Sequence, residues 1–348
     1  MTPQSKVQQF VDRIFEQPTP IQNRTEMEKG ASSRRYFRIE LAGDAPSLVQ
    51  MVLPEDSLKS DEAFGGAPPD ELPFINVQRH LAAANLPVPR VFLDATDEGH
   101  LFLEDLGEIT FNANLQGKSS DRVEAWYYAA VDLLAQMHNA MWPVDNTCLA
   151  SKRFFDFELL RWELDHYREW GLEKRNGVLL DTLTRQTLDR IFDRFAEEID
   201  ALPKGFVHRD YQSRNLMVLA DEPHPENLSI IDFQDALIGP RTYDLVALLN
   251  DSYVDLSAEV QERLIQRYAQ KRALPYAEIR HEFDLITIQR KLKDGGRFVF
   301  IDQVKGDPSF LPFVDKSFSR VRSALTRIDG HEELKAILQQ VDPDRFRI

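Results

Sequence analysis

The chain contains His208-Arg209-Asp210-Tyr211-Gln212-Ser213-Arg214-Asn215 and, after a polar loop, Ile230-Ile231-Asp232-Phe233-Gln234. Apolar runs lie beside these segments, at 205–207, 216–219 and 228–231. Short apolar runs next to turn residues predict buried strands, with Asp210, Asn215 and Asp232 at their ends and turns. Buried strands have no structural use for two carboxylates and an amide unless these groups bind a cation or move a proton. The stretch therefore predicts a chemical site.

The three polar groups fit phosphoryl transfer, which needs mainly positioning and the neutralisation of charge. An aspartate can accept the proton of the attacking hydroxyl, and this is the role predicted for Asp210. Asn215 and Asp232 supply the oxygen ligands that Mg²⁺ prefers, and are predicted to hold that ion on ATP. His208 and Asp244 are predicted to support the loop structurally. Asp244 begins an apolar helix, so a favourable interaction with the helix dipole is the alternative for this residue.

Length and composition indicate the general class of protein. With 348 residues, the chain is long enough for two lobes with separate cores. It has 57 acidic and 42 basic residues, and a net charge of −15 argues against a nucleic-acid-binding surface. The single cysteine, Cys148, excludes an internal disulfide and fits a reducing compartment. With no signal-like start and no apolar run of membrane-spanning length, we expect a cytoplasmic monomer without a membrane partner.

The first hundred residues favour strands, and the rest favours helices. The second half of residues 30–41 alternates apolar with polar residues, and residues 48–53 form a continuous apolar run. From residue 121 onward, apolar residues recur at helical spacing. The small-residue loop with Ser32, Ser33 and Arg35 can lay backbone N–H groups over phosphates, although a plain hairpin fits the same residues.

These motifs resemble those of the aminoglycoside phosphotransferase/choline kinase superfamily. Within it they resemble the anomeric N-acetylmuramate and N-acetylglucosamine kinases of bacterial cell-wall recycling. The likeness extends to residues 34–38 and 289–293, and so covers most of the chain. It implies a two-lobed α+β fold like that of protein kinases, with a small antiparallel-sheet lobe (1–104) and a larger, mainly helical lobe (105–348). It also implies ATP-dependent phosphorylation of the anomeric hydroxyl of one or both sugars.

The resemblance assigns further residues to the nucleotide and the sugar. Residues 100–107 correspond to the junction of the lobes in a kinase, so Glu104 and Leu106 are expected at the adenine edge; an ordinary strand end is the alternative. Cations at helical spacing in residues 289–297 are expected to meet an anionic substrate group, although a solvated helix face fits equally and Gly295-Gly296 weakens the helix prediction. The substrate residues expected in all are Arg214, Gln234, Asp235, Arg290 and Lys293.

One departure from protein kinases leaves alternatives open. Kinases carry a phosphate-binding lysine on the strand that corresponds to residues 48–53, paired with a glutamate on the next helix. This chain has no lysine in that strand and has Gln78 in the helix, so Arg34, Arg35 or Arg38 is the candidate cation. The missing lysine also fits a non-catalytic nucleotide-binding module. Among enzymes, a kinase of an aminoglycoside, choline or homoserine is the alternative to a sugar kinase.

Overall fold

The computed structural model describes residues 3–27, 34–54 and 71–346. The chain divides into two compact units. The first comprises Met1–Asn114 together with Arg214–Asp235, and the second comprises Leu115–Ser213 together with Ala236–Ile348. Each unit is built from two separate stretches of sequence, so the chain passes from one unit to the other at residues 213–214, in the middle of the stretch quoted above, and again at 235–236.

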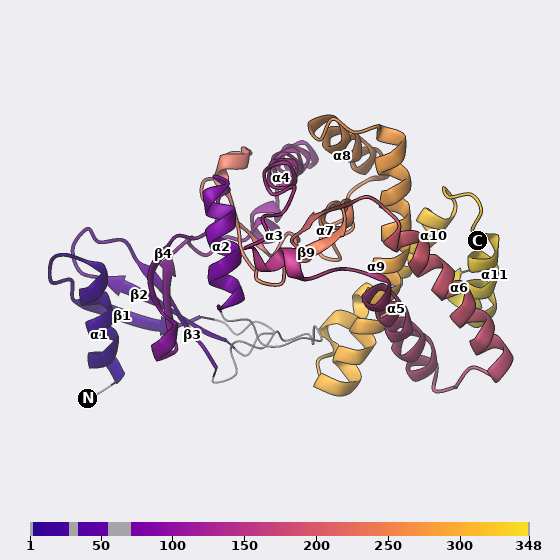
Figure 1. The fold of residues 1–348 in the computed structure, drawn as a ribbon, viewed down its shortest axis with the longest axis horizontal. Coiled ribbons are helices and arrows are strands. Elements are labelled where there is room, and N and C mark those ends of the chain that lie inside the picture. Colours follow the sequence, from indigo (N-terminus) through magenta and orange to yellow (C-terminus); the bar gives the residue numbers. More distant parts are fainter. Residues whose placement is uncertain (1–2, 28–33, 55–70, 347–348) are drawn as a thin grey trace. The chain divides into compact units, whose positions relative to one another are not determined.

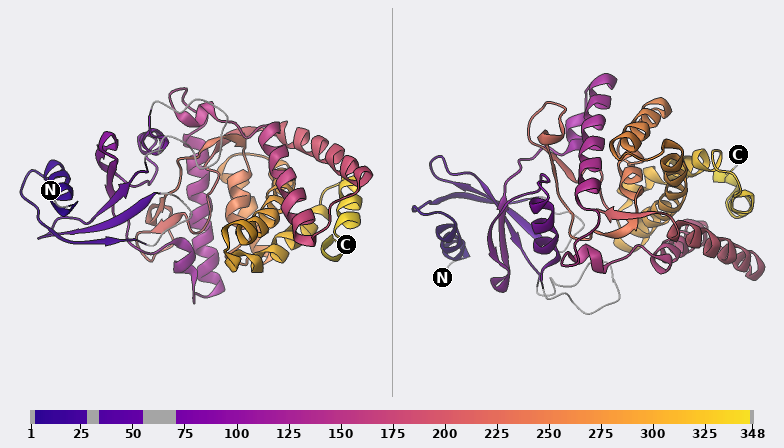
Figure 2. Two further views of the ribbon diagram at one scale, coloured as in Figure 1. Left: turned by 90° about the horizontal axis from the view of Figure 1, so that it is seen from below. Right: turned by 45° about the horizontal axis from the view of Figure 1, so that its top comes forward.

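The first unit is organised on a five-stranded antiparallel sheet (Figures 1 and 2). The strand order is β1-β2-β3-β5-β4, with β1 at Ile21–Glu26, β2 at Arg35–Leu41, β3 at Leu48–Val52, β4 at Val91–Ala95 and β5 at His100–Glu104. The alternation predicted for the second strand is present, because Phe37, Ile39 and Leu41 are all buried. The helix α1 (Pro3–Ile14) packs Phe10 and Val11 into the core cluster that contains Ile39.

A hairpin from later in the sequence completes this unit. Strands β7 (Leu216–Val218) and β8 (Leu228–Ile230) pair antiparallel. They are joined to the earlier residues by hydrogen bonds from Val218 N to Ile109 O (2.8 Å) and from Ile230 N to Pro87 O (2.7 Å). The remaining elements of the unit are α2 (Pro73–Ala83), α3 (Phe111–Leu115, which ends one residue beyond the unit) and the 3₁₀ turns Thr96–Glu98 and Pro225–Asn227.

The second unit is mainly helical (Figure 1). Its helices are α4 (Ser120–Ala140), α5 (Phe157–His166), α6 (Thr182–Asp200), α7 (Tyr243–Leu249), α8 (Ala258–Lys271), α9 (Tyr276–Lys305), α10 (Val314–Leu325), α11 (Glu332–Val341) and α12 (Pro343–Phe346). A π-helical segment covers Tyr167–Lys174, 3₁₀ turns cover Leu149–Lys152 and Pro308–Phe313, and β6 (Lys204–Val207) pairs with β9 (Leu237–Pro240). The predicted α+β class, with a small antiparallel sheet and a larger helical part, is confirmed.

The longest of these helices, α9, runs through the two glycines that weaken its prediction from sequence. A Cβ at Gly296 would lie 2.9 Å from both His166 O and Tyr167 Cα, which are backbone atoms of a neighbouring segment. A Cβ at Gly295 would lie 2.6 Å from the ring of Phe318 on α10. The glycines therefore let two neighbours approach closely, and the packing gained outweighs the intrinsic helix preference that they lack.

We expect Gly296→Ala to destabilise the protein by about 1–3 kcal/mol, because the overpacking it causes exceeds the gain in helix propensity of about 1 kcal/mol. The free energy of unfolding in urea measures this. Gly295→Ala is the matched comparison. Its new methyl group meets the side chain of Phe318, so adding Phe318→Leu in a double variant makes room for it. At Gly296 the methyl group meets backbone atoms, and no side-chain substitution can make room there. A Gly296→Ala protein as stable as the wild type would contradict the argument.

Near the C-terminus, His331 links the start of α11 to α6. Its Nε2 lies 2.9 Å from Glu198 Oε2, and its Nδ1 lies 2.8 Å from Asp329 O. Both contacts have acceptor oxygens, so both are hydrogen bonds only when the imidazole is doubly protonated. The hydrogen bond with Glu198 raises the pKa of His331, against the opposing effect of burial. The folded protein thus holds this proton more tightly than the unfolded chain, and stability falls as pH rises through the raised pKa.

We expect His331→Gln to lower the free energy of unfolding by about 1 kcal/mol at about pH 5.5, and by less at about pH 9, where the wild-type imidazole has lost its charge. Urea unfolding at the two pH values measures the difference. Glu198→Gln keeps an acceptor oxygen but removes the negative charge from this contact, so its loss of stability should likewise be larger at the lower pH. An equal loss for His331→Gln at both pH values would refute the ionic contact.

None of the helices in the described ranges has the length and hydrophobicity that crossing a membrane requires.

Candidate active site

The loop at 208–213 follows β6 in the second unit and is anchored by Asp244, in the first turn of α7. Asp244 is fully buried, and its two oxygens accept the backbone N–H groups of His208 (2.7 Å) and Arg209 (2.9 Å). His208 is also buried, and its Nδ1 accepts the N–H of Asp210 (3.3 Å). These are the anchoring contacts proposed from the sequence for His208 and Asp244, and their importance for activity stays a prediction.

A third group meets Asp244 that the sequence analysis did not single out. His138 of α4, also buried, places Nε2 3.0 Å from Asp244 Oδ2 and Nδ1 2.6 Å from the hydroxyl of Tyr268. Burial lowers the pKa of His138, against the opposing effect of the Asp244 hydrogen bond. In the sequence it was one histidine on an amphipathic helix, and its partners are more than a hundred residues away. Nothing in its local pattern separated it from an ordinary core histidine.

Asp210 lies on the anchored loop with its side chain 45% exposed, beside the buried side chain of Arg290, which is 2% exposed. The Nη2 of Arg290 is 3.7 Å from Asp210 Oδ1, and its Nη1 donates to the carbonyl of Arg209 (3.2 Å). Arg209 has φ of +80°, a conformation that non-glycine residues rarely adopt and that concentrates at functional sites. The unit thus presents one accessible carboxylate with a buried cation behind it, a geometry suited to accepting a proton from a bound hydroxyl.

Arg290 is buried in a polar part of α9. The alternative interpretation of this segment, a solvated helix face, is therefore wrong for Arg290. Its guanidinium stacks over the ring of Tyr243, with 4.7 Å to the ring centroid. Gln289 donates to Glu163 Oε2 (2.8 Å), and the Lys293 ammonium lies 3.2 Å from Asp294. Three of the buried atoms that make no hydrogen bond within the described part of the chain lie in this region: Arg290 Nε, Gln289 Oε1 and Tyr243 Oη. Buried polar atoms are normally bonded, so this is a candidate place for a polar ligand.

The two predicted metal ligands lie together in the first unit. Asn215 Nδ2 donates to Asp232 Oδ2 at 3.2 Å, and the N–H of Ile231 donates to the carbonyl of Asn215 at 3.1 Å. Gln234 Nε2 donates to the other oxygen of Asp232 at 2.9 Å. Asp232 is exposed and has φ of +66°, a second strained position, and Phe233 beside it packs on Phe74 of α2 (4.9 Å between centroids).

The chemistry of this donor set fits Mg²⁺. The ion is typically bound through one or two carboxylates or other oxygen ligands, with waters and substrate phosphates completing an octahedron. Asp232 offers a carboxylate and Asn215 an amide oxygen, next to each other on the protein surface. Within the described ranges there is no group of three or more His, Cys, Asp or Glu residues that would hold a metal by itself.

The other predicted substrate and nucleotide residues are placed as follows. Arg214 is exposed, and Gln234 bonds to Asp235 (3.4 Å) as well as to Asp232. Arg35 is exposed and forms a two-pronged ion pair with Glu26, with both N–O distances 2.9 Å. Ser32 and Ser33 lie outside the described residues.

The turn after β5 is held by Arg38 of β2. Arg38 bonds both oxygens of Asp105 (2.8 and 3.0 Å) and the carbonyl of Gly107 (2.9 Å). The predicted adenine-edge residues flank Asp105: Leu106 is half-buried, and Glu104 is exposed, its Oε2 accepting the N–H of Arg90 (3.0 Å). The guanidinium of Arg38 is therefore already committed to the turn, and it is a weak candidate for replacing the missing lysine.

Gln residues occupy two polar positions of the first unit. On β3, Gln50 is fully buried and accepts a hydrogen bond from Arg24 (2.9 Å). On α2, Gln78 donates to the carbonyl of Pro89 (3.0 Å). Gln78, at the position where a glutamate was expected in protein kinases, therefore has a structural partner of its own.

The small antiparallel sheet, the mainly helical unit and the loop carrying an anchored, accessible aspartate define a phosphotransferase of the protein-kinase-like class. The chain belongs to the phosphotransferase enzyme family, whose profile matches residues 24–280. It is 33% identical over 317 residues to an N-acetylmuramate/N-acetylglucosamine kinase of Pseudomonas aeruginosa, covering 88% of this chain and 85% of that protein. It is 31% identical to a protein of the same name from Neisseria meningitidis, over 90% of this chain and 89% of the relative.

Solved structures with the same fold are more distant in sequence. The ADP-bound aminoglycoside phosphotransferase APH(2'')-Ib has a TM-score of 0.57 at 14% identity, covering 91% of this chain and 97% of that one. A choline/ethanolamine kinase family protein from Mesorhizobium loti has a TM-score of 0.54 at 16% identity, covering 90% and 92%. These likenesses confirm the kinase-like fold predicted from the sequence.

Proposed function

We propose that the protein transfers the γ-phosphoryl group of ATP to the anomeric hydroxyl of N-acetylmuramate and N-acetylglucosamine, giving the α-1-phosphate. One observation carries the proposal: an accessible carboxylate, Asp210, is held on a loop that Asp244 anchors and Arg290 backs. The choice of sugar is supported by the similarity to relatives named for these two substrates, over 85% and 89% of their length. We further propose that the reaction takes place in the cytoplasm, where ATP is available, and that the protein acts as a monomer.

In this proposal Asp210 orients the anomeric hydroxyl and accepts its proton. An anomeric hydroxyl is more acidic than an ordinary alcohol, so a carboxylate is an adequate base for it. The anchors on the Asp210 loop fix the direction of this carboxylate before the sugar arrives, which is the main requirement in a reaction governed by positioning.

We propose that Asn215 and Asp232 hold the Mg²⁺ ion that binds the phosphates of ATP. When bound, the ion neutralises the phosphate charge that develops during transfer. The hydrogen bonds from Gln234 and Asn215, one to each oxygen of Asp232, orient the carboxylate that is proposed to hold the ion. Residues 1–104, with Ser32, Ser33, Arg35 and Glu104, are assigned to covering ATP, and Leu106, just beyond this lobe, is assigned to the same nucleotide site.

The sugar is assigned to residues 105–348, with Arg290 and Lys293 as its main partners and Arg214, Gln234 and Asp235 as further candidates. N-acetylmuramate carries a lactyl carboxylate, for which a cation of α9 is a suitable partner. The unbonded Gln289 Oε1 and Tyr243 Oη nearby on α9 and α7 offer an acceptor and a donor for the hydroxyl and acetamido groups that both sugars share.

The proposal is tested by mixing the purified protein with Mg-ATP and one of N-acetylmuramate, N-acetylglucosamine, kanamycin, choline or homoserine, and measuring ADP release. Phosphorus NMR of the product shows whether the phosphate is on the anomeric carbon. We expect turnover on the two sugars alone. Turnover on kanamycin, choline or homoserine instead would make the protein another small-molecule kinase, and ATP binding without turnover on any of them would make it a nucleotide-binding module.

A further inference from the structure

A second buried carboxylate anchors the other end of the Asp210 loop. Asp251 lies two residues beyond the end of α7, is 2% exposed, and accepts both the backbone N–H (2.9 Å) and the side-chain hydroxyl of Ser213. Its other oxygen accepts the N–H of Tyr253 (3.1 Å). We propose that Asp251 is a positioning residue that, acting through Ser213, holds Asp210 in the geometry needed for proton acceptance. This inference rests on the function proposed above for Asp210.

Contacts in the middle of the loop lie between these two anchors. Arg290 Nη1 donates to the carbonyl of Arg209 (3.2 Å), His208 Nδ1 accepts the N–H of Asp210 (3.3 Å), and Gln212 N donates to Asp210 O (2.8 Å). Asp210 therefore sits between two anchors that come from opposite ends of the same seven-residue helix, α7, whose residues are all buried. The Asp244 contacts hold the first residues of the loop, and the Asp251 contacts hold its last residue, Ser213.

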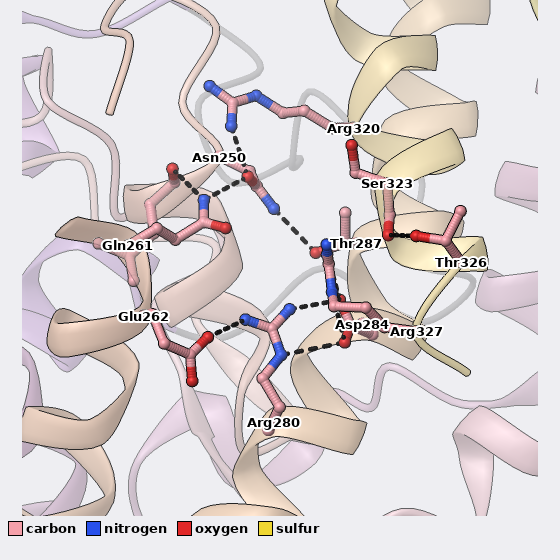
Figure 3. Close-up of polar contacts among 11 residues, drawn as sticks. Asn250, Gln261, Glu262, Arg280, Asp284, Thr287, Arg320, Ser323, Thr326 and Arg327 are labelled. Carbon is pink, nitrogen blue, oxygen red and sulfur yellow. Dashed lines mark hydrogen bonds and ion pairs between the residues drawn. The ribbon is translucent and has the colours of Figure 1, made fainter. Parts of the chain in front are cut away.

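Asp251 is itself held by a polar network centred on its neighbour, Asn250 (Figure 3). Asn250 Nδ2 donates to the hydroxyl of Thr287 on α9 (2.8 Å). Its Oδ1 accepts from Arg320 of α10 (2.8 Å) and from Gln261 of α8 (2.9 Å). All four side chains point toward one another in Figure 3, so three separate helices fix the segment that carries Asp251. The Asn250 amide can serve all three helices because it donates through its nitrogen and accepts through its oxygen at the same time.

The same helices are tied together one turn away on α9. Asp284, 2% exposed, accepts from Arg327, two residues beyond the end of α10, at 2.7 Å and from Arg280 of its own helix at 3.0 Å, and Arg280 also meets Glu262 of α8 at 3.2 Å (Figure 3). Removing one partner of a buried charged network leaves the others without compensation, so such a network resists deformation. Asp251 thus lies in a segment that hydrogen bonds to several helices hold in place. A residue that positions another residue must itself be fixed in this way.

Small displacements matter in this setting. A misplacement of about 1 Å at a reacting group can lower the rate by on the order of 10²-fold, even when the change lies away from the chemistry. Ser213→Ala removes only the hydroxyl bond to Asp251 and keeps the backbone bond, so it loosens the loop without leaving a buried group unpaired. We expect it to lower kcat by about tenfold and to leave the Kd and stoichiometry of nucleotide binding unchanged.

The test uses the full chain and four variants. Ser213→Thr keeps the hydroxyl and should restore kcat. Asp251→Asn turns one acceptor oxygen into a donor that must face either the Ser213 donors or the Tyr253 N–H, and should lower kcat further. Thr326→Ala removes a hydroxyl bond to the carbonyl of Ser323 (2.8 Å) on α10, away from Ser213, and is the matched control that should match the wild type. Nucleotide-binding stoichiometry by calorimetry shows that each variant is fully folded, so that a lower kcat is a property of each site.

Hydrogen exchange gives a readout that does not depend on turnover. The backbone amides of residues 208–213 should exchange faster in Ser213→Ala and Asp251→Asn than in the wild type, by on the order of tenfold, and unchanged in Thr326→Ala. Wild-type kcat in Ser213→Ala, or wild-type exchange in Asp251→Asn, would overturn the inference. If the wild-type protein phosphorylates none of the candidate compounds, the proposed function fails, and the exchange comparison alone decides whether Asp251 positions the loop.

Discussion

Asp210→Asn is expected to lower kcat by about 10²–10⁴-fold, the usual contribution of a general base, while the affinity for Mg-ATP stays within about twofold. The asparagine has nearly the same shape but cannot take up a proton from the sugar. The loop should keep its conformation, because its anchors, Asp244 and Asp251, contact other residues of the loop. Steady-state kinetics with the preferred sugar measures kcat, and calorimetry measures nucleotide binding.

The control for Asp210→Asn is Asp97→Asn, the same chemical change at an exposed position in the first unit. Both variants lose one negative charge, so an effect of net charge would appear in both. A kcat for Asp210→Asn within about threefold of the wild type would remove Asp210 from the reaction, because loss of a working base costs far more than that. A matching loss of nucleotide affinity would instead indicate that the loop had been disturbed.

The fold class followed from local signals, because the strands around the active-site loop are short apolar runs with turn residues between them. The pairing of Asn215 with Asp232 followed from the same signals: Asn215 comes directly before β7 and Asp232 lies two residues after β8 of the same hairpin, so the chain itself brings them to 3.2 Å. The burial of Phe37, Ile39 and Leu41 likewise follows from alternation within one strand. Features that depend on a single element, or on two adjacent ones, could be predicted.

The anchors of the loop depended on long-range contacts and were only partly predicted. Asp244 was placed by its position at the start of an apolar helix, but its partner His138 lies 106 residues away in the chain, and Ser213 and Asp251 are 38 residues apart. A buried aspartate after a helix and a serine in a loop look ordinary in a sequence. The two glycines of α9 weakened a helix prediction that was correct. Their low helix propensity can be read from the local sequence, whereas the close approach of residues 166–167 to Gly296 and of Phe318 to Gly295 cannot.

Asp232→Asn should affect the nucleotide and not only the rate. We expect the Mg²⁺-dependent part of ATP affinity to fall by at least about tenfold, and on the order of 100-fold if Asp232 binds the ion directly. Both oxygens of Asp232 accept amide N–H groups, from Asn215 and from Gln234. The new amide must therefore turn an N–H toward one of these donors, so the variant loses a charge and one of the two hydrogen bonds. The backbone should be preserved, because asparagine tolerates the positive φ of this position better than most residues.

Calorimetric titration of ATP at several Mg²⁺ concentrations separates this effect from others. For Asp232→Asn the ATP affinity at saturating Mg²⁺ should approach the metal-free value, whereas Asp210→Asn should keep the full Mg²⁺ dependence. Asn215→Asp is the matched comparison, because it keeps an oxygen ligand and adds charge, so it should retain Mg²⁺-dependent binding. If Asp232→Asn bound Mg-ATP as the wild type does, the ion would have to be held elsewhere. The two variants differ because their residues act at different stages. Asp232, which is proposed to hold the metal, acts when the nucleotide binds, and Asp210, which is proposed to take the proton, acts only during the reaction.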